Sequence, residues 1–220
     1  MGEKMNLLQG LRMHAASLPA SPQDVFSHLP VLDTPRLELR PVTMRDALDI
    51  YAYSRDPEVA RYVLWEAHKS ISDSKGYIRF LLKQYREGQP SSWGIVLKAT
   101  GHVIGTIGYM AFSEENSTVE IGYSLARSHW NQGLMTEAVH AVLALSFDKM
   151  HIHRVEAQHD AANPASGRVM AKCGMHHEGR LRGRVYNKGR FVDVDLYAML
   201  REDWVKMRPP GWHPASPRPY

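Results

Sequence analysis

A glycine turn between an apolar strand and a helix is the first feature of this sequence that could do chemistry. Residues 121–125 (Ile-Gly-Tyr-Ser-Leu) are typical of a strand, Gly133 falls in the turn, and residues 134–149 carry a helical pattern. The first backbone N–H groups of a helix have no partner inside it and lie at the positive end of its dipole. Because a glycine lets a phosphate approach these groups closely, the turn is suited to bind a pyrophosphate. The alternative is a plain strand-to-helix turn, and the spacing excludes a Walker motif and a dinucleotide fingerprint.

An Asn-x-x-Ser motif follows the next strand along the chain. Residues 154–159 alternate like a strand, and Asn163 and Ser166 open the helix that comes after it. Pro164 occupies the first position of this helix and Gly174 lies just past its end, which is the usual placing of these two residue types. Two polar motifs at the starts of two helices are therefore the candidate ligand-binding features.

Strand and helix patterns mix along the rest of the chain. Strands are expected where apolar and polar residues alternate, and helices where apolar residues recur every three or four positions. Thr43 with Asp46 resembles a capping box that opens one helix, and Gly88 ends another. We expect helices at 47–51 and 71–87, strands at 37–39, 93–97, 103–112 and 118–125, and two last strands around the turn at 187–189. The predicted class is α+β, with one central sheet and helices on both of its faces.

The composition indicates one folded domain with two less regular ends. The chain has 220 residues, 44% hydrophobic and 23% charged, with a net charge of +4 and a single cysteine, so no disulfide can form within it. We predict an arm at 1–33, a domain at 34–204 and a proline-rich tail at 205–220. No apolar stretch is as long as a membrane span or a signal core, so a cytoplasmic location without membrane contact is expected. A short docking helix is expected in the arm, around Leu7, Leu8 and Leu11, and the prolines at 19, 22 and 30 are expected to end it.

The ordered set of motifs resembles the GNAT acetyltransferase superfamily, and most of all its RimJ/RimL branch of ribosomal-protein N-terminal acetyltransferases. The resemblance covers residues 34–204. It rests on Thr-Pro-Arg-Leu at 34–37, the strand at 121–125, Gly-Leu-Met-Thr-Glu-Ala at 133–138, the Asn-x-x-Ser helix and a Gly-x-x-x-Glu-Gly hairpin at 174–179. It implies a GNAT-like fold with a mixed, mostly antiparallel sheet, and the transfer of an acetyl group from acetyl-CoA to a primary amine.

The resemblance also implies where acetyl-CoA would bind. Backbone groups of Tyr123, Ser124 and Leu125 would pair with the pantetheine arm like an added strand. Asn163 would hydrogen-bond the pantetheine, and Ser166 would lie near the thioester. The pyrophosphate would lie on Asn131, Gln132, Gly133, Leu134, Met135 and Thr136. Trp130 and Met135 depart from many relatives, which we interpret as a variant loop. No metal is expected, because the histidine pairs at 151/153 and 176/177 lack a pattern of partner ligands.

The catalytic residues of the family do not carry over directly. In the alanine-acetylating relatives a glutamate lies five residues before the motif asparagine and a tyrosine seven residues after it, where this chain has Gln158 and Met170. Neither side chain can serve as a base or an acid. The remaining candidates are Glu120, Glu156 and Ser166, whose alternative interpretations are solvated strand carboxylates and a serine in a helix's first turn. We predict that Glu120, directly or through water, accepts the amine proton and that Ser166 protonates the leaving thiolate.

The acceptor is expected to be an α-amine, above all a protein N-terminus such as that of a ribosomal protein. An α-amine has a pKa near ~8, against ~10.4 for lysine, so a site with one carboxylate and no tyrosine acid deprotonates it more easily. Trp65, Tyr109 and Tyr186 are candidates for the walls of the substrate cleft. Three alternatives remain. The enzyme could acetylate a small amine such as a polyamine, an amino acid or an antibiotic. The chain could instead be a CoA-binding module without turnover, or a ribosome- or RNA-binding protein. The sequence leaves open whether the protein forms a homodimer. It also leaves open whether the basic hairpin at 180–190 contacts CoA or an acidic partner.

Overall fold

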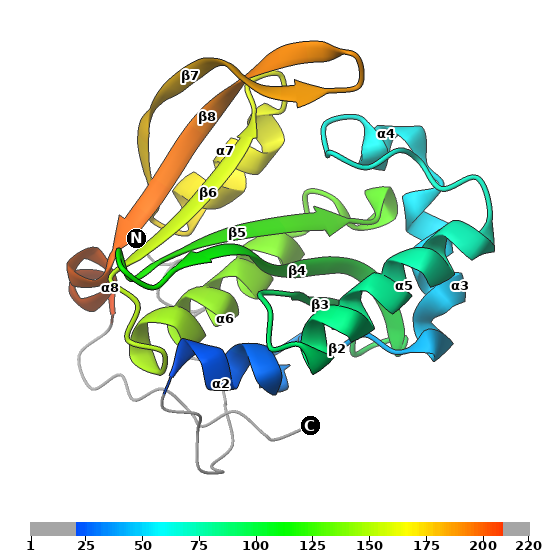
Figure 1. The fold of residues 1–220 in the computed structure, drawn as a ribbon, viewed down its shortest axis with the longest axis horizontal. Helices are drawn as coiled ribbons and strands as arrows, with labels where there is room; N and C mark the ends of the chain where they lie inside the picture. Colours follow the sequence, from blue (N-terminus) through cyan, green and yellow to red (C-terminus); the bar gives the residue numbers. More distant parts are fainter. Residues whose placement is uncertain (1–20, 209–220) are drawn as a thin grey trace.

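One mixed sheet forms the centre of the structure, a computed structural model that describes residues 21–208. Within that range eight strands follow one another in the order β1-β2-β3-β4-β5-β6-β8-β7 (Figure 1). Every neighbouring pair is antiparallel except β5 and β6, which run parallel. The strands are β1 (Leu32–Asp33), β2 (Leu37–Pro41), β3 (Ser92–Leu97), β4 (His102–Ser113), β5 (Thr118–Leu125), β6 (Arg154–Asp160), β7 (His176–Asn187) and β8 (Arg190–Leu200). The predicted meander at 93–125 and the class of the sheet are confirmed.

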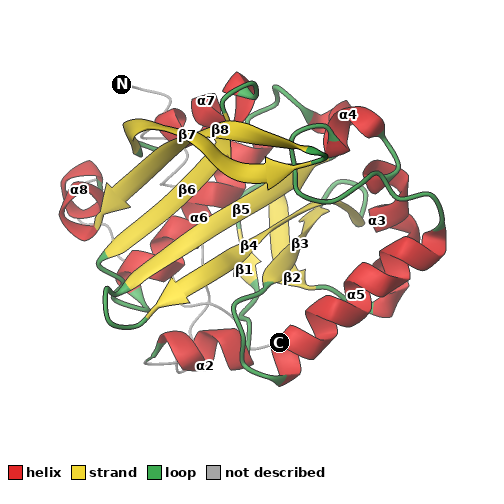
Figure 2. Cartoon of the chain, turned by 45° about the horizontal axis from the view of Figure 1, so that its top comes forward, coloured by secondary structure: helices red, strands yellow, loops and turns green. Residues whose placement is uncertain are grey.

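Helices cover both faces of the sheet, as predicted (Figure 2). The apolar helix α6 is buried from Leu134 to Phe147 against one face, where its side chains form a core with alternate strand residues such as Ile95. On the opposite face α3 and α5 form a second core with the residues in between, such as Val96. The helices are α2 (Pro22–Ser27), α3 (Ala47–Ser54), α4 (Pro57–Ala60), α5 (Ile71–Arg86), α6 (Leu134–Asp148), α7 (Pro164–Lys172) and α8 (Arg201–Met207), with 3-10 turns η1 (Met44–Asp46) and η2 (Arg127–His129). None of the helices within 21–208 combines the length and apolar content that a membrane span requires.

A gap opens in the sheet between the two parallel strands. β5 and β6 are paired only at their first three positions, the last of which joins Glu120 to Glu156. Beyond that pair the two strands diverge (Figure 1), although β5 stays bonded to β4 as far as Leu125. The second half of β5 therefore presents one backbone edge to the gap instead of to another strand.

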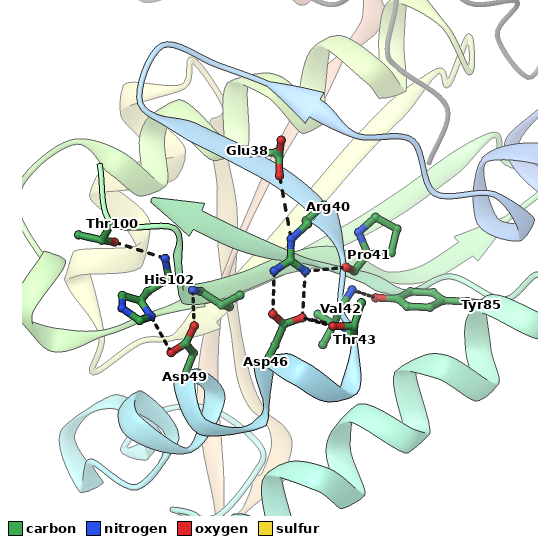
Figure 3. A network of polar contacts seen from close by, with 11 residues as sticks. Glu38, Arg40, Pro41, Val42, Thr43, Asp46, Asp49, Tyr85, Thr100 and His102 are labelled. Atoms are coloured by element: carbon green, nitrogen blue, oxygen red, sulfur yellow. Dashed lines mark hydrogen bonds and ion pairs between the residues drawn. The ribbon is translucent and has the colours of Figure 1, made fainter. Parts of the chain in front are cut away.

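A polar network ties α3 and α5 to the strands beneath them (Figure 3). Arg40 of β2 donates two hydrogen bonds to Asp46, over 2.9 and 2.7 Å. Asp49 of α3 accepts one from the backbone N–H of Val103, over 2.9 Å. In α5 the Tyr85 hydroxyl accepts a hydrogen bond from the backbone N–H of the residue after β2, over 3.0 Å. These contacts fix the position of α5, which borders the candidate site.

The ends of the predicted domain are more ordered than the composition indicates. Residues 22–33 of the predicted arm form α2 and β1, whose Val25 and Leu32 are fully buried in the core. Pro22 is the first residue of α2, so it begins a helix instead of ending one. At the other end α8 continues past Trp204 to Met207. The docking helix expected around Leu7, Leu8 and Leu11 and the tail from residue 209 onward lie outside the described residues.

Candidate active site

A cleft lies at the gap between β5 and β6. A first pocket of about 470 Å³ lies between the end of β5, the start of α6 and α7. A second pocket of about 380 Å³ lies on the other side, between α5, the inner half of β5 and the β7–β8 hairpin. The two pockets share Tyr62, Val63, Tyr123, Ser124, Asn163 and Ser166, so they adjoin each other at the gap.

The glycine turn forms the floor of the first pocket. Gly133 precedes the first residue of α6 with a φ of +74°, and Asn131 also has a positive φ, of +59°. Both line the pocket together with Leu134, Met135 and Thr136. The first N–H groups of a long buried helix therefore face this space, which is the setting that binds anions. Of the residues expected here, Gln132 is outside the pocket wall and donates its side-chain N–H to the carbonyl of Ser128 over 2.9 Å.

A buried carboxylate holds the turn in place from behind. Glu137 in the first turn of α6 accepts hydrogen bonds from the Thr34 hydroxyl (2.6 Å), the Arg36 backbone N–H (2.8 Å) and the Arg36 Nε (2.7 Å). The same guanidinium donates to the carbonyl of Gln132 over 2.9 Å. The Thr-Pro-Arg-Leu segment thus fixes the turn and places a positive charge beside Gly133.

The strand edge expected to receive the pantetheine lies along the first pocket. Tyr123, Ser124 and Leu125 line it. The carbonyl of Leu125 accepts the indole N–H of Trp130 over 2.8 Å. This bond gives the unusual Trp130 a structural role, because it closes the turn that follows β5. It leaves Tyr123 and Ser124 as the residues whose backbone is best placed to pair with a ligand in the gap.

The N-terminus of α7 forms the opposite wall. Asn163 precedes the helix, and its Nδ2 donates to the Ser166 Oγ over 3.0 Å. The Tyr123 hydroxyl donates to the Ser166 carbonyl over 3.0 Å, which connects β5 to α7 across the gap. Burial raises the pKa of this Tyr123 phenol above its usual value. The structure therefore brings Asn163 and Ser166 to the place where the two pockets meet.

Positive side chains line the first pocket away from the gap. Arg168 and Lys172 are one turn apart on α7, and Arg61 follows α4 on the other side. A pocket with three cations and an exposed helix N-terminus suits a ligand that carries several phosphates. Helix α4, which precedes Arg61, has only four residues, too few to show a helical period in the sequence.

Glu120 is the carboxylate at the gap. It is the last residue of β5 to pair with β6, it is half-buried, and its Oε1 accepts a hydrogen bond from Gln158 Nε2 over 2.9 Å. Both side chains line the second pocket. Glu156, the other candidate base, is outside that wall and is bound to Arg154 over 2.6 Å. Of these two glutamates, Glu120 is therefore the one that lines the second pocket.

The three aromatic residues predicted to wall the substrate cleft have different positions. Trp65 and Tyr109 line the second pocket, although Tyr109 is only 1% exposed and its hydroxyl is bonded to Ser146 over 2.8 Å. Tyr186 lies outside the pocket wall, 63% exposed, and packs edge-on against Phe191. Its neighbours at 185 and 187 line the pocket instead, because successive side chains of a strand point to opposite faces. No three metal-ligating side chains gather anywhere in residues 21–208.

Comparisons with known proteins agree with this geometry. The chain matches the acetyltransferase (GNAT) domain over residues 36–176. It is 33% identical over 174 residues to p20, an uncharacterised N-acetyltransferase of Bacillus licheniformis, covering 79% of this chain and 98% of that one. It is 27% identical over 182 residues to an alanine N-acetyltransferase of ribosomal protein uS5 from Escherichia coli, covering 80% and 94%. A GNAT-family acetyltransferase structure from Bacillus anthracis superposes with a TM-score of 0.70 at 25% identity, covering 78% of this chain and 99% of that one. The chain therefore belongs to the GNAT family of N-acetyltransferases.

Proposed function

We propose that this enzyme binds acetyl-CoA in the first pocket and acetylates an α-amine that enters through the second, the N-terminus of a protein being the foremost candidate. The observation that carries this proposal is the pair of adjoining pockets at the gap, with Glu120 in the wall of the second. The pyrophosphate would lie on the turn around Gly133, and the pantetheine along Tyr123 and Ser124. The resemblance to an alanine N-acetyltransferase of ribosomal protein uS5 supports the choice of a protein acceptor.

The reaction on this arrangement is a direct transfer. The amine nitrogen attacks the carbonyl carbon of the thioester, the new C–N bond forms, and the C–S bond breaks. The amine proton passes to Glu120, directly or through one water. The CoA thiolate takes up a proton, for which the Ser166 hydroxyl at the meeting point of the two pockets is the candidate donor. Backbone N–H groups at the edge of β5 are the candidates for stabilising the oxyanion.

A site with Glu120 as its one candidate base and no tyrosine acid favours an α-amine over a lysine side chain. With a pKa near ~8, about a tenth of α-amines are uncharged at pH 7, against about four in ten thousand lysines at ~10.4. Deprotonating lysine therefore costs roughly 3 kcal/mol more. Met170, which stands where relatives have a tyrosine acid, is buried and contributes no proton donor.

The test compares two glutamates that are register partners on the adjacent strands β5 and β6. Glu120→Gln should lower kcat at least tenfold near neutral pH and leave the KM for acetyl-CoA nearly unchanged, because a positioned base contributes about 100- to 10,000-fold. The loss should shrink at high pH, where the amine deprotonates without help. Glu156→Gln, the register partner, is the matched control and should retain most of the activity. An equal loss at every pH would mean that Glu120 positions the substrate and is not the base, and preferred turnover of lysine side chains would refute the α-amine.

A further inference from the structure

The second pocket differs from the first in its charge. Among the residues of the described range that line it, none is lysine or arginine, whereas Arg61, Arg168 and Lys172 line the first pocket. Among its described lining residues the first pocket also has one carboxylate, Glu58, which is paired with Arg61 over 3.3 Å and leaves Arg168 and Lys172 in excess. Two carboxylates, Glu120 and Asp160, line the second pocket. The one histidine there lies beneath α7, where a Cβ on Gly167 would come within 2.6 Å of its Nε2 atom. An ammonium group can approach such a surface, but a carboxylate on the same ligand would find no cation to pair with.

The outer walls of the second pocket are apolar and open to solvent. Leu64, Phe80 and Met110 line it with 72%, 54% and 52% of their surface exposed. They come from three separate parts of the chain: the segment after α4, helix α5 and strand β4. Trp65 adds an aromatic side chain to the lining of this pocket. Exposed apolar side chains from unrelated elements that converge on one opening are typical of a binding site for an apolar group.

We infer that the acceptor carries a bulky apolar group beside its amine and no carboxylate next to that amine. The inference rests on the proposed function and narrows its substrate. It favours a peptide N-terminus whose first side chain is large and apolar, since the carboxyl group of that residue is an uncharged amide. It excludes free amino acids as good substrates, because their α-carboxylate would lie close to Glu120 and Asp160.

Matched small amines test the inference. We would measure CoA release with phenylalanine amide, alanine amide and free phenylalanine, and compare kcat/KM per fraction of uncharged amine so that differences in amine pKa cancel. Phenylalanine amide should exceed both other amines at least tenfold. Equal or better turnover of alanine amide or of free phenylalanine would overturn the inference while the proposed function stands. Failure of every amine, including a panel of N-terminal peptides, to release CoA would instead refute the proposed function and the inference with it.

A pair of surface variants locates the selectivity. Phe80→Ser changes an exposed residue of the pocket wall, and Phe191→Ser makes the same change at a residue that is 71% exposed on the hairpin and outside both pockets. Phe80→Ser should reduce the preference for phenylalanine amide over alanine amide to less than threefold, and Phe191→Ser should keep it. If both variants keep the full preference, the apolar group does not bind on this wall. Circular dichroism on both variants separates a local effect from loss of the fold.

Discussion

Gly133→Val tests the phosphate-binding turn directly. The glycine has a φ of +74°, and the one described atom within 4 Å of a Cβ added there, beyond its chain neighbours, is the Arg36 Nη2 at 3.6 Å, so the side chain would project into open space. Because Gly133 lines the first pocket, that space is the one proposed for the pyrophosphate. The valine should therefore exclude acetyl-CoA without filling a packed part of the protein.

The structure also supplies a control with the same backbone conformation. Gly101, in the turn between β3 and β4, has a φ of +73°, and a Cβ added there would have no described atom within 4 Å beyond its chain neighbours. A residue with a Cβ in this left-handed region costs about 1–2 kcal/mol. A domain of this size loses about 2–4 °C in Tm per kcal/mol, so each valine variant should melt about 2–8 °C lower than wild type. The strain is matched, and only one of the two sites borders the first pocket.

Thermal melting with and without acetyl-CoA then isolates the binding effect. At a ligand concentration of about 100 times Kd, binding adds about 2.7 kcal/mol, which raises the Tm by about 5–11 °C. Wild type and Gly101→Val should show this rise, and Gly133→Val should show almost none. If Gly133→Val is stabilised as much as Gly101→Val, the pyrophosphate does not bind at this turn and our assignment is wrong.

Two further variants test the supports of the site. Glu137→Gln should lower the free energy of unfolding by about 2–3 kcal/mol, because a hydrogen bond to a charged group is lost at a buried position. The same variant should raise the KM for acetyl-CoA more than it changes kcat. An unchanged KM would mean that Arg36 does not position the turn. Burial raises the pKa of Asp46, but hydrogen bonds from Arg40 and Thr43 outweigh it and leave the pKa below its ordinary value of 3.8. The Asp46 carboxylate therefore stabilises the fold above about pH 4, and this contribution is lost as the pH falls through the folded-state pKa. In urea titrations, the difference in free energy of unfolding between wild type and Asp46→Asn should shrink below pH 4. A difference that stays constant with pH would contradict the stabilising role of the ion pair between Arg40 and Asp46.

Periodic elements could be predicted from the sequence, because their patterns are local. The helix ending before Gly88 and the three strands of the meander repeat their apolar residues often enough to be recognised. The four-residue α4 has no such period. It is held by the tip of the β7–β8 hairpin, where Lys188 Nζ donates to the Ala60 carbonyl and Asn187 Nδ2 to the Val63 carbonyl over 3.3 Å. Contacts across more than 120 positions are not visible in a single sequence, so this wall of the cleft was missed.

In the candidate site too, residues set by local motifs could be predicted, whereas residues set by strand pairing could not. Positions fixed by a turn or a helix start, such as Gly133 and Asn163, lie where the motifs predict. Tyr186 was placed in the cleft wrongly. The pairing of β7 with β8 shifts in register between Leu181 and Val185. A register shift changes the face of the sheet to which the later residues of the strand point. The contact between Glu120 and Gln158 depends on how far β5 and β6 stay paired, which no local pattern determines.

The hydrogen-bond partner of Glu120, the amide of Gln158, is suited to a base that must stay negatively charged. A base that must take a proton from an arriving ammonium group has to keep its negative charge and its orientation. A lysine or arginine at position 158 would orient the carboxylate but also neutralise it and repel the ammonium. Gln158 donates one hydrogen bond over 2.9 Å and adds no charge, so the carboxylate is oriented while the second pocket stays free of cations among its described lining residues. Of the two pockets, only the first has lysine or arginine among its described lining residues, and the phosphates would lie there. On the proposed function, the two substrates would therefore approach the gap from sides that differ in charge, each attracted by the groups that suit it.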